Sequence, residues 1–401
     1  MQSSLKLEEI RNELIKEIDN KKAYYIDISH KIHENPEIGN EEFFASNILI
    51  DTLSKKGFDI EKALVGHPTS FIARKKSSRN SGPTIGFLAE YDALPKIGHA
   101  CGHNIIGTAS ISAAIAISNL IDKIGGEIVV FGTPAEEGGT NGSAKATFVK
   151  NNLFEGIDAC LLAHPWNKDS VTGKCLALDP IDFEFFGKAS HAAESPEKGI
   201  NALNAVIELF NGINALRQHL TSDIKIHGII TNGGDAPNIV PEYAKAKFFV
   251  RAETRKSCDE TTEKVINIAK GAALITNTKL KTTFFQNQID DFLINRTFDM
   301  IFAENAKLIG LDIKTSLDYG LGSTDAGNVS HVVPTIQPYV KIAPNNVAAH
   351  TIEFSAAAKS SDGDNGLINA SKALALTALD LIIDKNKLDE IKRDFQINAK
   401  H

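Results

Sequence analysis

The stretch Gly98–Asn104 reads Gly-His-Ala-Cys-Gly-His-Asn and closely follows an acidic turn that contains Glu90 and Asp92. In an extended backbone, side chains at positions i and i+2 lie on the same side, so Cys101 and His103 can converge on one metal ion. A buried cysteine beside a hydrogen-bonded histidine is the commoner explanation of an isolated Cys-x-His pair. The rest of the chain has to decide between these two interpretations.

The adjacent carboxylates Glu136 and Glu137 form a second chemical group, in the segment Pro-Ala-Glu-Glu-Gly-Gly. Neighbouring side chains on non-helical backbone point in roughly opposite directions, so we expect the two to do different jobs. One can bind a metal ion while the other acts as general base on water that the metal activates, which is what hydrolysis of an amide requires. The flanking glycines are equally compatible with a solvated loop.

His164 and His350 complete a set of candidate ligands. His164 ends an apolar segment and precedes Pro165, an unusual place for a surface histidine, and His350 follows two alanines in a late turn. Either histidine alone is more often structural. Together with Cys101, His103 and the glutamate pair, they supply thiolate, imidazole and carboxylate donors from predicted strand ends and turns, which core histidines do not explain.

Three short apolar segments, 84–89, 126–132 and 158–163, have the pattern of buried strands, and each leads into one of these polar groups. Helical patterns cover 41–56 and 105–121. Strands that alternate with helices predict an α/β domain with helices around a mixed sheet, and such sheets place their sites at the carboxyl ends of strands.

The pattern changes near Asp179. Strand-like segments at 181–187, 224–231, 244–254 and 279–286 surround long helical segments at 200–220 and 257–272. We therefore predict an inserted α+β domain over 179–295, with residues 1–178 and 296–401 forming the main domain.

The composition excludes some classes of protein. A chain of 401 residues is expected to form two domains, and its net charge of -7 gives no electrostatic basis for binding nucleic acid. We see neither a signal peptide nor an uninterrupted apolar stretch of membrane-spanning length. The four cysteines lack framework spacing and are expected to be reduced thiols. We expect a cytoplasmic protein without a membrane or nucleic-acid partner.

Eight motifs in order carry a family resemblance between about residues 30 and 380. They are Glu-Tyr-Asp-Ala-Leu-Pro, Gly-His-Ala-Cys-Gly-His-Asn, Pro-Ala-Glu-Glu-Gly-Gly, Ala-His-Pro, Gly-Lys-Ala-Ser-His-Ala-Ala, Asn-Ile-Val-Pro, Gly-Ser-Thr-Asp-Ala-Gly-Asn-Val-Ser and Ala-Ala-His-Thr. The chain resembles the amidohydrolase branch of the aminoacylase and glutamate-carboxypeptidase type di-metal peptidases, especially aminobenzoyl-glutamate hydrolase subunits and related dipeptidases.

The resemblance implies two divalent metal ions per subunit, Glu136 as general base and Asp92 as the carboxylate that orients a ligand. The implied metal ligands are Cys101, His103, Glu137, His164 and His350. Thiolate and imidazole favour zinc, whereas sites with carboxylates also accept manganese. The chain departs from many wider relatives by having Glu90 in place of a histidine ligand and Cys101 in place of a bridging aspartate. We expect His99 to fix the loop rather than bind metal.

The inserted domain resembles the family's lid and dimerisation domain. The resemblance implies that His191 reaches the partner subunit's active site and stabilises the oxyanion, and that Asn238 and Arg251 hold the substrate's terminal carboxylate. A strand-surface charge is the alternative for Arg251. Residues 323–325 are expected to shape the pocket wall without chemistry. The expected assembly is a homodimer, with a dimer of dimers left open.

We therefore predict a metal-dependent hydrolase that cleaves the amide bond of dipeptides or of N-acyl or aroyl amino acids. Deacetylation of an amino-acid precursor by the same mechanism is an alternative. A catalytically silent binding or assembly protein is a third reading, which the presence of both Glu136 and Glu137 disfavours.

Overall fold

The computed structural model describes residues 2–79, 81–315 and 322–399. Contacts between Cα atoms divide the chain into two compact units. The main unit comprises Met1–Lys174, Phe292–Gly320 and Asp325–His401, and the inserted unit comprises Cys175–Asp291 and Leu321–Thr324.

The main unit is built on a mixed sheet with the strand order β1-β2-β4-β3-β5-β11. The strands β3, β4, β5 and β11 are parallel, whereas β2 runs antiparallel to β4 and β1 antiparallel to β2. Their bounds are β1 (Asp59–Lys62), β2 (Phe71–Lys76), β3 (Thr84–Ala89), β4 (Glu127–Gly132), β5 (Ala159–Leu161) and β11 (Thr335–Ile336). A separate parallel pair joins β6 (His164–Trp166) to β12 (Tyr339–Lys341).

The predicted α/β fold with a mixed sheet is confirmed. The apolar segments at 84–89, 126–132 and 158–163 contain β3, β4 and β5. The strands β1 and β2 were not predicted from the sequence, because β1 is polar and largely exposed and β2 ends in charged residues at the margin of the sheet.

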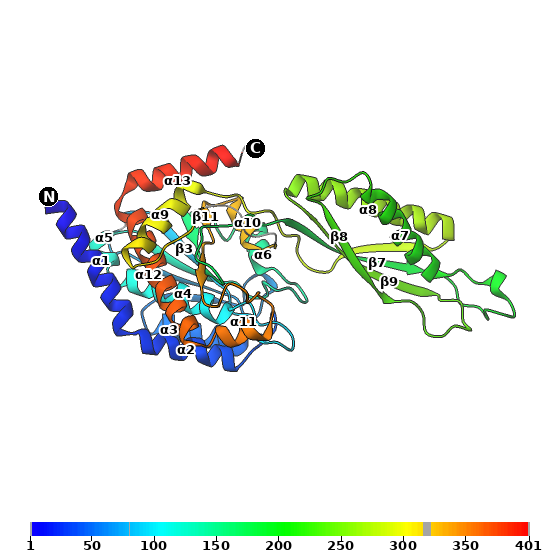
Figure 1. The fold of residues 1–401 in the computed structure, drawn as a ribbon, viewed down its shortest axis with the longest axis horizontal. Coiled ribbons are helices and arrows are strands. Elements are labelled where there is room, and N and C mark those ends of the chain that lie inside the picture. Colours follow the sequence, from blue (N-terminus) through cyan, green and yellow to red (C-terminus); the bar gives the residue numbers. More distant parts are fainter. Residues whose placement is uncertain (1, 80, 316–321, 400–401) are drawn as a thin grey trace. The chain divides into compact units, whose positions relative to one another are not determined.

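Helices surround this sheet (Figure 1). Their bounds are α1 (Gln2–Asn20), α2 (Lys22–Glu34), α3 (Phe43–Ser54), α4 (His103–Ser118), α5 (Ile121–Ile124), α6 (Ala144–Lys150), α9 (Arg296–Leu308), α10 (Ala326–Ser330), α11 (Ile352–Ala357), α12 (Ser361–Ile383) and α13 (Lys385–Asn398), with a 3-10 turn at Leu64–Gly66. Every residue of α4 is buried, which explains its Ala- and Ile-rich composition. This helix packs against α12 and against β3 and β4.

The helix α12 is long and apolar enough to cross a membrane by length and composition, contrary to the expectation from the sequence. Of its most apolar 18-residue window, 83% is buried inside the protein. The helix packs against α1, α4 and α9, as the core helix of a globular unit does. Its apolar composition is therefore explained by packing within the main unit.

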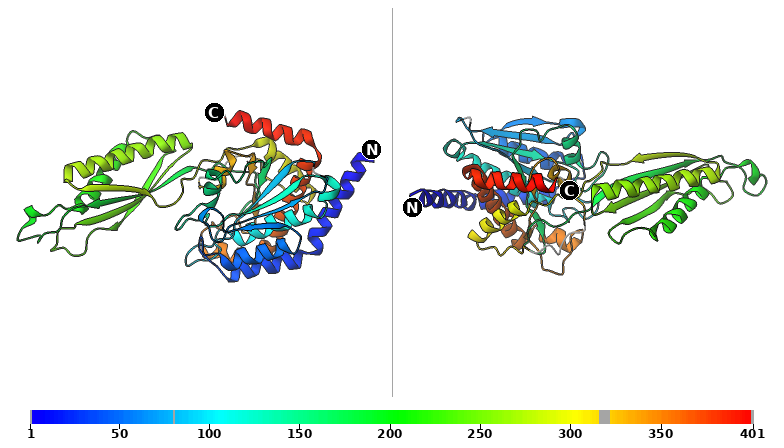
Figure 2. Two further views of the ribbon diagram at one scale, coloured as in Figure 1. Left: turned by 180° about the vertical axis from the view of Figure 1, so that it is seen from behind. Right: turned by 90° about the horizontal axis from the view of Figure 1, so that it is seen from above.

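The inserted unit is an antiparallel sheet with the strand order β10-β7-β9-β8, and two helices cover one of its faces (Figure 2). The bounds are β7 (Ala177–Phe186), β8 (Lys225–Asn232), β9 (Tyr243–Ala252), β10 (Lys279–Phe284), α7 (Ala202–Arg217) and α8 (Arg255–Thr276), with a 3-10 turn at Pro196–Lys198. Alternate residues of β9, from Ala244 to Ala252, are buried. The other residues of β9 therefore form the open face of the sheet.

Candidate active site

The carboxyl ends of the parallel strands bring the predicted groups together in the main unit. Glu90 and Asp92 follow β3, the glutamate pair follows β4, and His164 begins β6 shortly after β5. Because β3, β4 and β5 are neighbours in one sheet, their carboxyl ends meet at one edge. His350 reaches the same place through its backbone, whose N–H donates to the carbonyl of Ala100 at 2.8 Å.

Cys101, His103 and His164 form one group of donor atoms close enough to hold a metal ion. The Cys101 sulfur lies 3.5 Å from Nε2 of His164, and the other ring nitrogen of His164 lies 2.7 Å from the carbonyl oxygen of Pro165. If Nδ1 donates to this carbonyl, Nε2 keeps its lone pair for a metal ion. All three side chains are buried.

Cys101, Glu137 and His350 form a second such group, so Cys101 belongs to both. Nε2 of His350 lies 3.2 Å from a carboxylate oxygen of Glu137. A half-exposed His350 leaves this side of the cluster open to solvent, because 54% of its side chain is accessible. The arrangement provides two adjacent donor groups that share one thiol.

Asp92 connects the two groups without being a donor in either. One of its oxygens lies 2.8 Å from Nδ1 of His103, and the other accepts a hydrogen bond from the backbone N–H of Glu137 at 2.9 Å. Nε2 of His103 is thereby aimed at the cluster, where it has no hydrogen-bond partner within the described part of the chain. A buried nitrogen in this state fits the role of a metal ligand.

The backbone differs from the extended geometry that the sequence led us to expect for Cys101 and His103. Gly102 has φ 79°, and His103 is the first residue of α4, so the two side chains converge across a turn. Glycine is suited to this conformation because it has no Cβ.

The expectation that Glu136 and Glu137 point in opposite directions is wrong. A carboxylate oxygen of Glu136 lies 3.9 Å from Nε2 of His103, and one of Glu137 lies 4.0 Å from the same atom. Both residues lie in a turn that follows Ala135, which has φ 59°, so the alternation of an extended strand does not apply. Both carboxylates face the cluster.

The charges in the cluster perturb one another. Burial, together with the neighbouring carboxylates Glu90 and Glu137, raises the pKa of Glu136 well above its usual range. Burial lowers the pKa of His164 to about 4, which keeps its imidazole neutral. Burial alone would lower the pKa of His103, but Cys101 and Asp92 raise it well above the usual value. A neutral His164 and an electron-rich surrounding are what cation binding requires.

Lys145, which was not predicted from the sequence, is fully buried beside this cluster. Its Nζ lies 2.9 Å from Glu90 and 2.5 Å from Asp325. Asp325 was expected only to shape a pocket wall, and it instead forms a buried ion pair. No local pattern indicated these contacts, because Lys145 and Asp325 are 180 positions apart. His99 is buried beside His33, with 5.9 Å between ring centroids, and belongs to none of the donor groups among the described residues.

The remaining predicted residues lie in the inserted unit, in two places. His191 and Asn238 are exposed neighbours: the N–H of Ala192 donates to the carbonyl of Asn238 at 3.0 Å, and Nδ1 of His191 accepts from the N–H of Glu194 at 3.1 Å. Nε2 of His191 is consequently the nitrogen that can donate outward.

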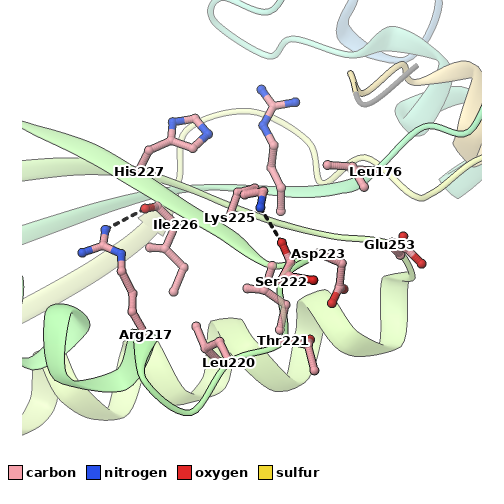
Figure 3. A pocket seen from close by; sticks show the side chains of 12 residues that line it. Leu176, Arg217, Leu220, Thr221, Ser222, Asp223, Lys225, Ile226, His227 and Glu253 are labelled. Atoms are coloured by element: carbon pink, nitrogen blue, oxygen red, sulfur yellow. Dashed lines mark hydrogen bonds between the residues drawn. The ribbon is translucent and has the colours of Figure 1, made fainter. Parts of the chain in front are cut away.

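Arg251 lies elsewhere, on the open face of the sheet. Its guanidinium donates to Oγ of Ser323 at 2.8 Å and lies over the ring of Phe249, 5.4 Å from the centroid. It also lines a pocket of about 960 Å³, whose other lining residues include His227 and Glu253 (Figure 3). The alternative of a fully solvated surface charge does not describe Arg251, because it is partly buried.

Known proteins resemble the chain over nearly its whole length. It is 33% identical to the human Xaa-Arg dipeptidase over 388 residues, which cover 92% of the chain and 88% of that relative. The model of the M20 peptidase dimerisation domain matches residues 181–276. The chain belongs to the M20 peptidase family.

Further M20 proteins support the same grouping. The chain is 29% identical to a p-aminobenzoyl-glutamate hydrolase polypeptide from Escherichia coli (strain K12), over 93% of the chain and 92% of that protein. A dinuclear metal-binding M20 peptidase from Bacillus subtilis has the same fold, with a TM-score of 0.65 and 19% identity over 91% of this chain and 99% of that one. The predicted resemblance is thus confirmed, and this M20 protein is a hydrolase of peptide or other amide bonds.

Proposed function

We propose that this M20 protein is a two-metal hydrolase that removes the amino-terminal or acyl portion of dipeptides and of N-acyl or aroyl amino acids. The observation that carries the proposal is the pair of donor groups that share Cys101, with Glu136 facing both. The names of the dipeptidase and of the aminobenzoyl-glutamate hydrolase support the substrate class.

The proposed ligands are Cys101, His103 and His164 for one ion and Cys101, Glu137 and His350 for the other. A divalent metal ion bound there would polarise the amide carbonyl and make water easier to deprotonate. The metal that we propose is zinc, because thiolate and imidazole favour it, and manganese is the alternative that the carboxylates allow. Metal analysis of the purified protein distinguishes the two.

Glu136 is the proposed general base. Its carboxylate faces the cluster and is 11% exposed, so water and substrate can reach it. The raised pKa of Glu136 suits a group that accepts a proton from water and then donates it to the leaving amine. Asp92 acts as a positioning residue, since it holds the His103 ring and the backbone of Glu137.

We propose that His191 and Asn238 complete the site of a partner subunit, and that Arg251 with Ser323 binds the substrate's carboxylate. An exposed His191 with a donating Nε2 suits stabilisation of an oxyanion. The match to the dimerisation domain supports self-association. The strand β8 offers a surface for it, because it is an edge strand that carries the exposed side chains Ile229 and Ile230. We propose a cytoplasmic homodimer, and measurement of the mass in solution tests it against a dimer of dimers.

The test of the function is Glu136→Ala, compared with wild type and with Glu61→Ala, which changes an exposed glutamate on β1. Wild type and both variants should retain metal. Glu136→Ala should lose about 10²- to 10⁴-fold in kcat on a panel of dipeptides, acetyl amino acids and aminobenzoyl amino acids. Full activity of Glu136→Ala with bound metal would show that the base is wrongly assigned.

The same panel separates the alternatives. Preference for acetyl over aminobenzoyl derivatives of one amino acid would indicate a deacetylase. Metal-loaded wild-type protein that turns over no member of the panel would support a silent binding protein.

A further inference from the structure

Glu90 has a carboxylate oxygen that no protein hydrogen bond explains. The residue follows β3 directly and its side chain is 1% exposed. One oxygen, Oε1, lies 2.9 Å from Nζ of Lys145. The other, Oε2, has no hydrogen-bond partner among the residues that the structure describes, and it lies 3.5 Å from Nε2 of His103. A buried carboxylate oxygen without a partner is costly unless a cation is nearby.

Lys145 and Asp325 account for one half of Glu90 only. Asp325 uses both of its oxygens on residue 145, because Oδ1 contacts Nζ and Oδ2 accepts from the backbone N–H at 3.1 Å. This arrangement fixes the ammonium, and the ammonium in turn fixes Oε1 of Glu90. The opposite oxygen is consequently held toward His103, away from the ion pair.

The separation between Oε2 of Glu90 and Nε2 of His103 suits two ligands of one ion. Nitrogen and oxygen ligands lie about 2.0–2.2 Å from zinc, so two of them in a tetrahedral shell are about 3.4 Å apart. The sulfur of Cys101 and Nε2 of His164, which belong to the donor group of His103, are also 3.5 Å apart. Glu90, His103 and Glu136 also lie close enough together to hold an ion.

We propose that Glu90 is an additional metal ligand, which binds through Oε2 the same ion as His103, while Lys145 holds its other oxygen. The inference rests on the proposed two-metal function. Glu136 faces the same atom of His103 but is 11% exposed, whereas Glu90 is enclosed. Glu136 can therefore reach water and substrate, and Glu90 is confined to the ion.

The proposed ligand also changes the expected metal preference. A site of one thiolate and two imidazoles favours zinc, and a carboxylate added to it makes manganese and cobalt better competitors. Lys145 has a matching role, since carboxylates that ligate metals are themselves commonly held by hydrogen bonds.

The test compares wild type, Glu90→Gln and Glu42→Gln in metal binding, without an activity assay. Glu42 is a matched control, because it is fully buried and accepts hydrogen bonds from Thr69 and the backbone of Ala135, but it belongs to none of the donor groups found in the described part of the chain. Each protein is stripped of metal, dialysed against a series of cobalt or zinc concentrations, and analysed for bound metal. Visible absorption of the cobalt form reports the number of ligands.

Wild type and Glu42→Gln should each bind two ions per subunit. Glu90→Gln should bind one of the two at least about 10-fold more weakly, with altered d–d absorption and a retained thiolate-to-cobalt band. Unchanged affinities and an unchanged cobalt spectrum in Glu90→Gln would overturn the inference. Wild type that binds no metal would instead contradict the proposed function itself.

A second variant separates a ligand from a counter-ion. Glu90→Gln leaves Lys145 paired with Asp325, so we expect it to fold, which circular dichroism of the metal-free protein verifies. The double variant Glu90→Gln/Lys145→Gln removes both charges of the pair and should show the same weakened metal site. Wild-type metal binding in the double variant would mean that Glu90 serves only to neutralise Lys145. If Glu90→Gln does not fold, the double variant decides the question alone.

Discussion

At the scale of single residues, burial determines what each histidine of the main unit can do. His103 is buried against Asp92 and faces the donor cluster, whereas His67 is buried outside the donor groups that the described residues form. Nδ1 of His67 lies 2.8 Å from Oδ1 of Asn40, and Nε2 lies 3.4 Å from Nδ2 of Asn141. His67 therefore supports the loop that follows the glutamate pair, and its protonation is coupled to folding.

Acid should destabilise the protein through His67. Burial lowers the pKa of His67 to about 4, below the value of about 6.5 in an unfolded chain. Between these values the unfolded state binds more protons, so the free energy of unfolding falls as the pH drops from about 6.5 to about 4. One such group contributes a slope of at most about 1.4 kcal/mol per pH unit.

His67→Gln should lose this part of the acid sensitivity, and His331→Gln, which changes an exposed histidine, should keep it. Urea unfolding at about pH 7 and about pH 5 measures the difference. Equal slopes in wild type and His67→Gln would show that His67 does not titrate in this window.

At the scale of elements, the close approach of α4 to the end of β3 sets the position of His103. Gly107 lies one turn after His103, and a Cβ built on it would lie 2.6 Å from the carbonyl oxygen of Glu90 and 3.2 Å from Cδ1 of Leu49. No larger residue fits without a shift of backbone. The distance between the first turn of α4 and Glu90 therefore depends on this glycine.

Gly107→Ala should destabilise the main unit by about 1–3 kcal/mol and weaken metal binding, because it moves His103 away from Glu90 and Asp92. Gly271→Ala on α8 is the matched control, since a Cβ there meets nothing within 4 Å. That change should stabilise by up to about 1 kcal/mol through helix propensity. Urea unfolding and equilibrium dialysis measure both effects, and wild-type values for Gly107→Ala would contradict the role given to the helix contact.

At the scale of the whole molecule, the proposed active site requires two subunits. The donor cluster and Glu136 belong to the main unit, while His191 is an exposed residue of the inserted unit. An exposed histidine without a local function suits a residue that acts on a partner.

His191→Ala and Glu136→Ala should each be inactive alone, and a mixture that has exchanged subunits should recover activity. In a random mixture about half of the dimers are heterodimers, and each would contain one intact site, so recovery should approach about a quarter of wild type. Each variant mixed with itself is the control. No recovery despite exchange, verified by mass measurement of differently tagged subunits, would place His191 outside the partner's site.

The sequence by itself determined the kinds of chemical group in the site and the strands that deliver them. Cys101, His103 and His164 could be selected because buried strands end in turns at predictable places, and side chains at the carboxyl ends of neighbouring parallel strands must meet. The α+β character of the inserted segment followed from alternation in its strands, which depends only on local pattern.

Only the tertiary structure decided how Glu136 and Glu137 are turned and what surrounds Glu90. The positive φ of Ala135 orients both carboxylates toward one cluster, and no residue type at that position indicated it. Lys145 and Asp325 are 180 positions apart, so their buried pair depends on packing between distant elements. A buried charge is stable only beside its partner, and that partner is supplied by the complete fold.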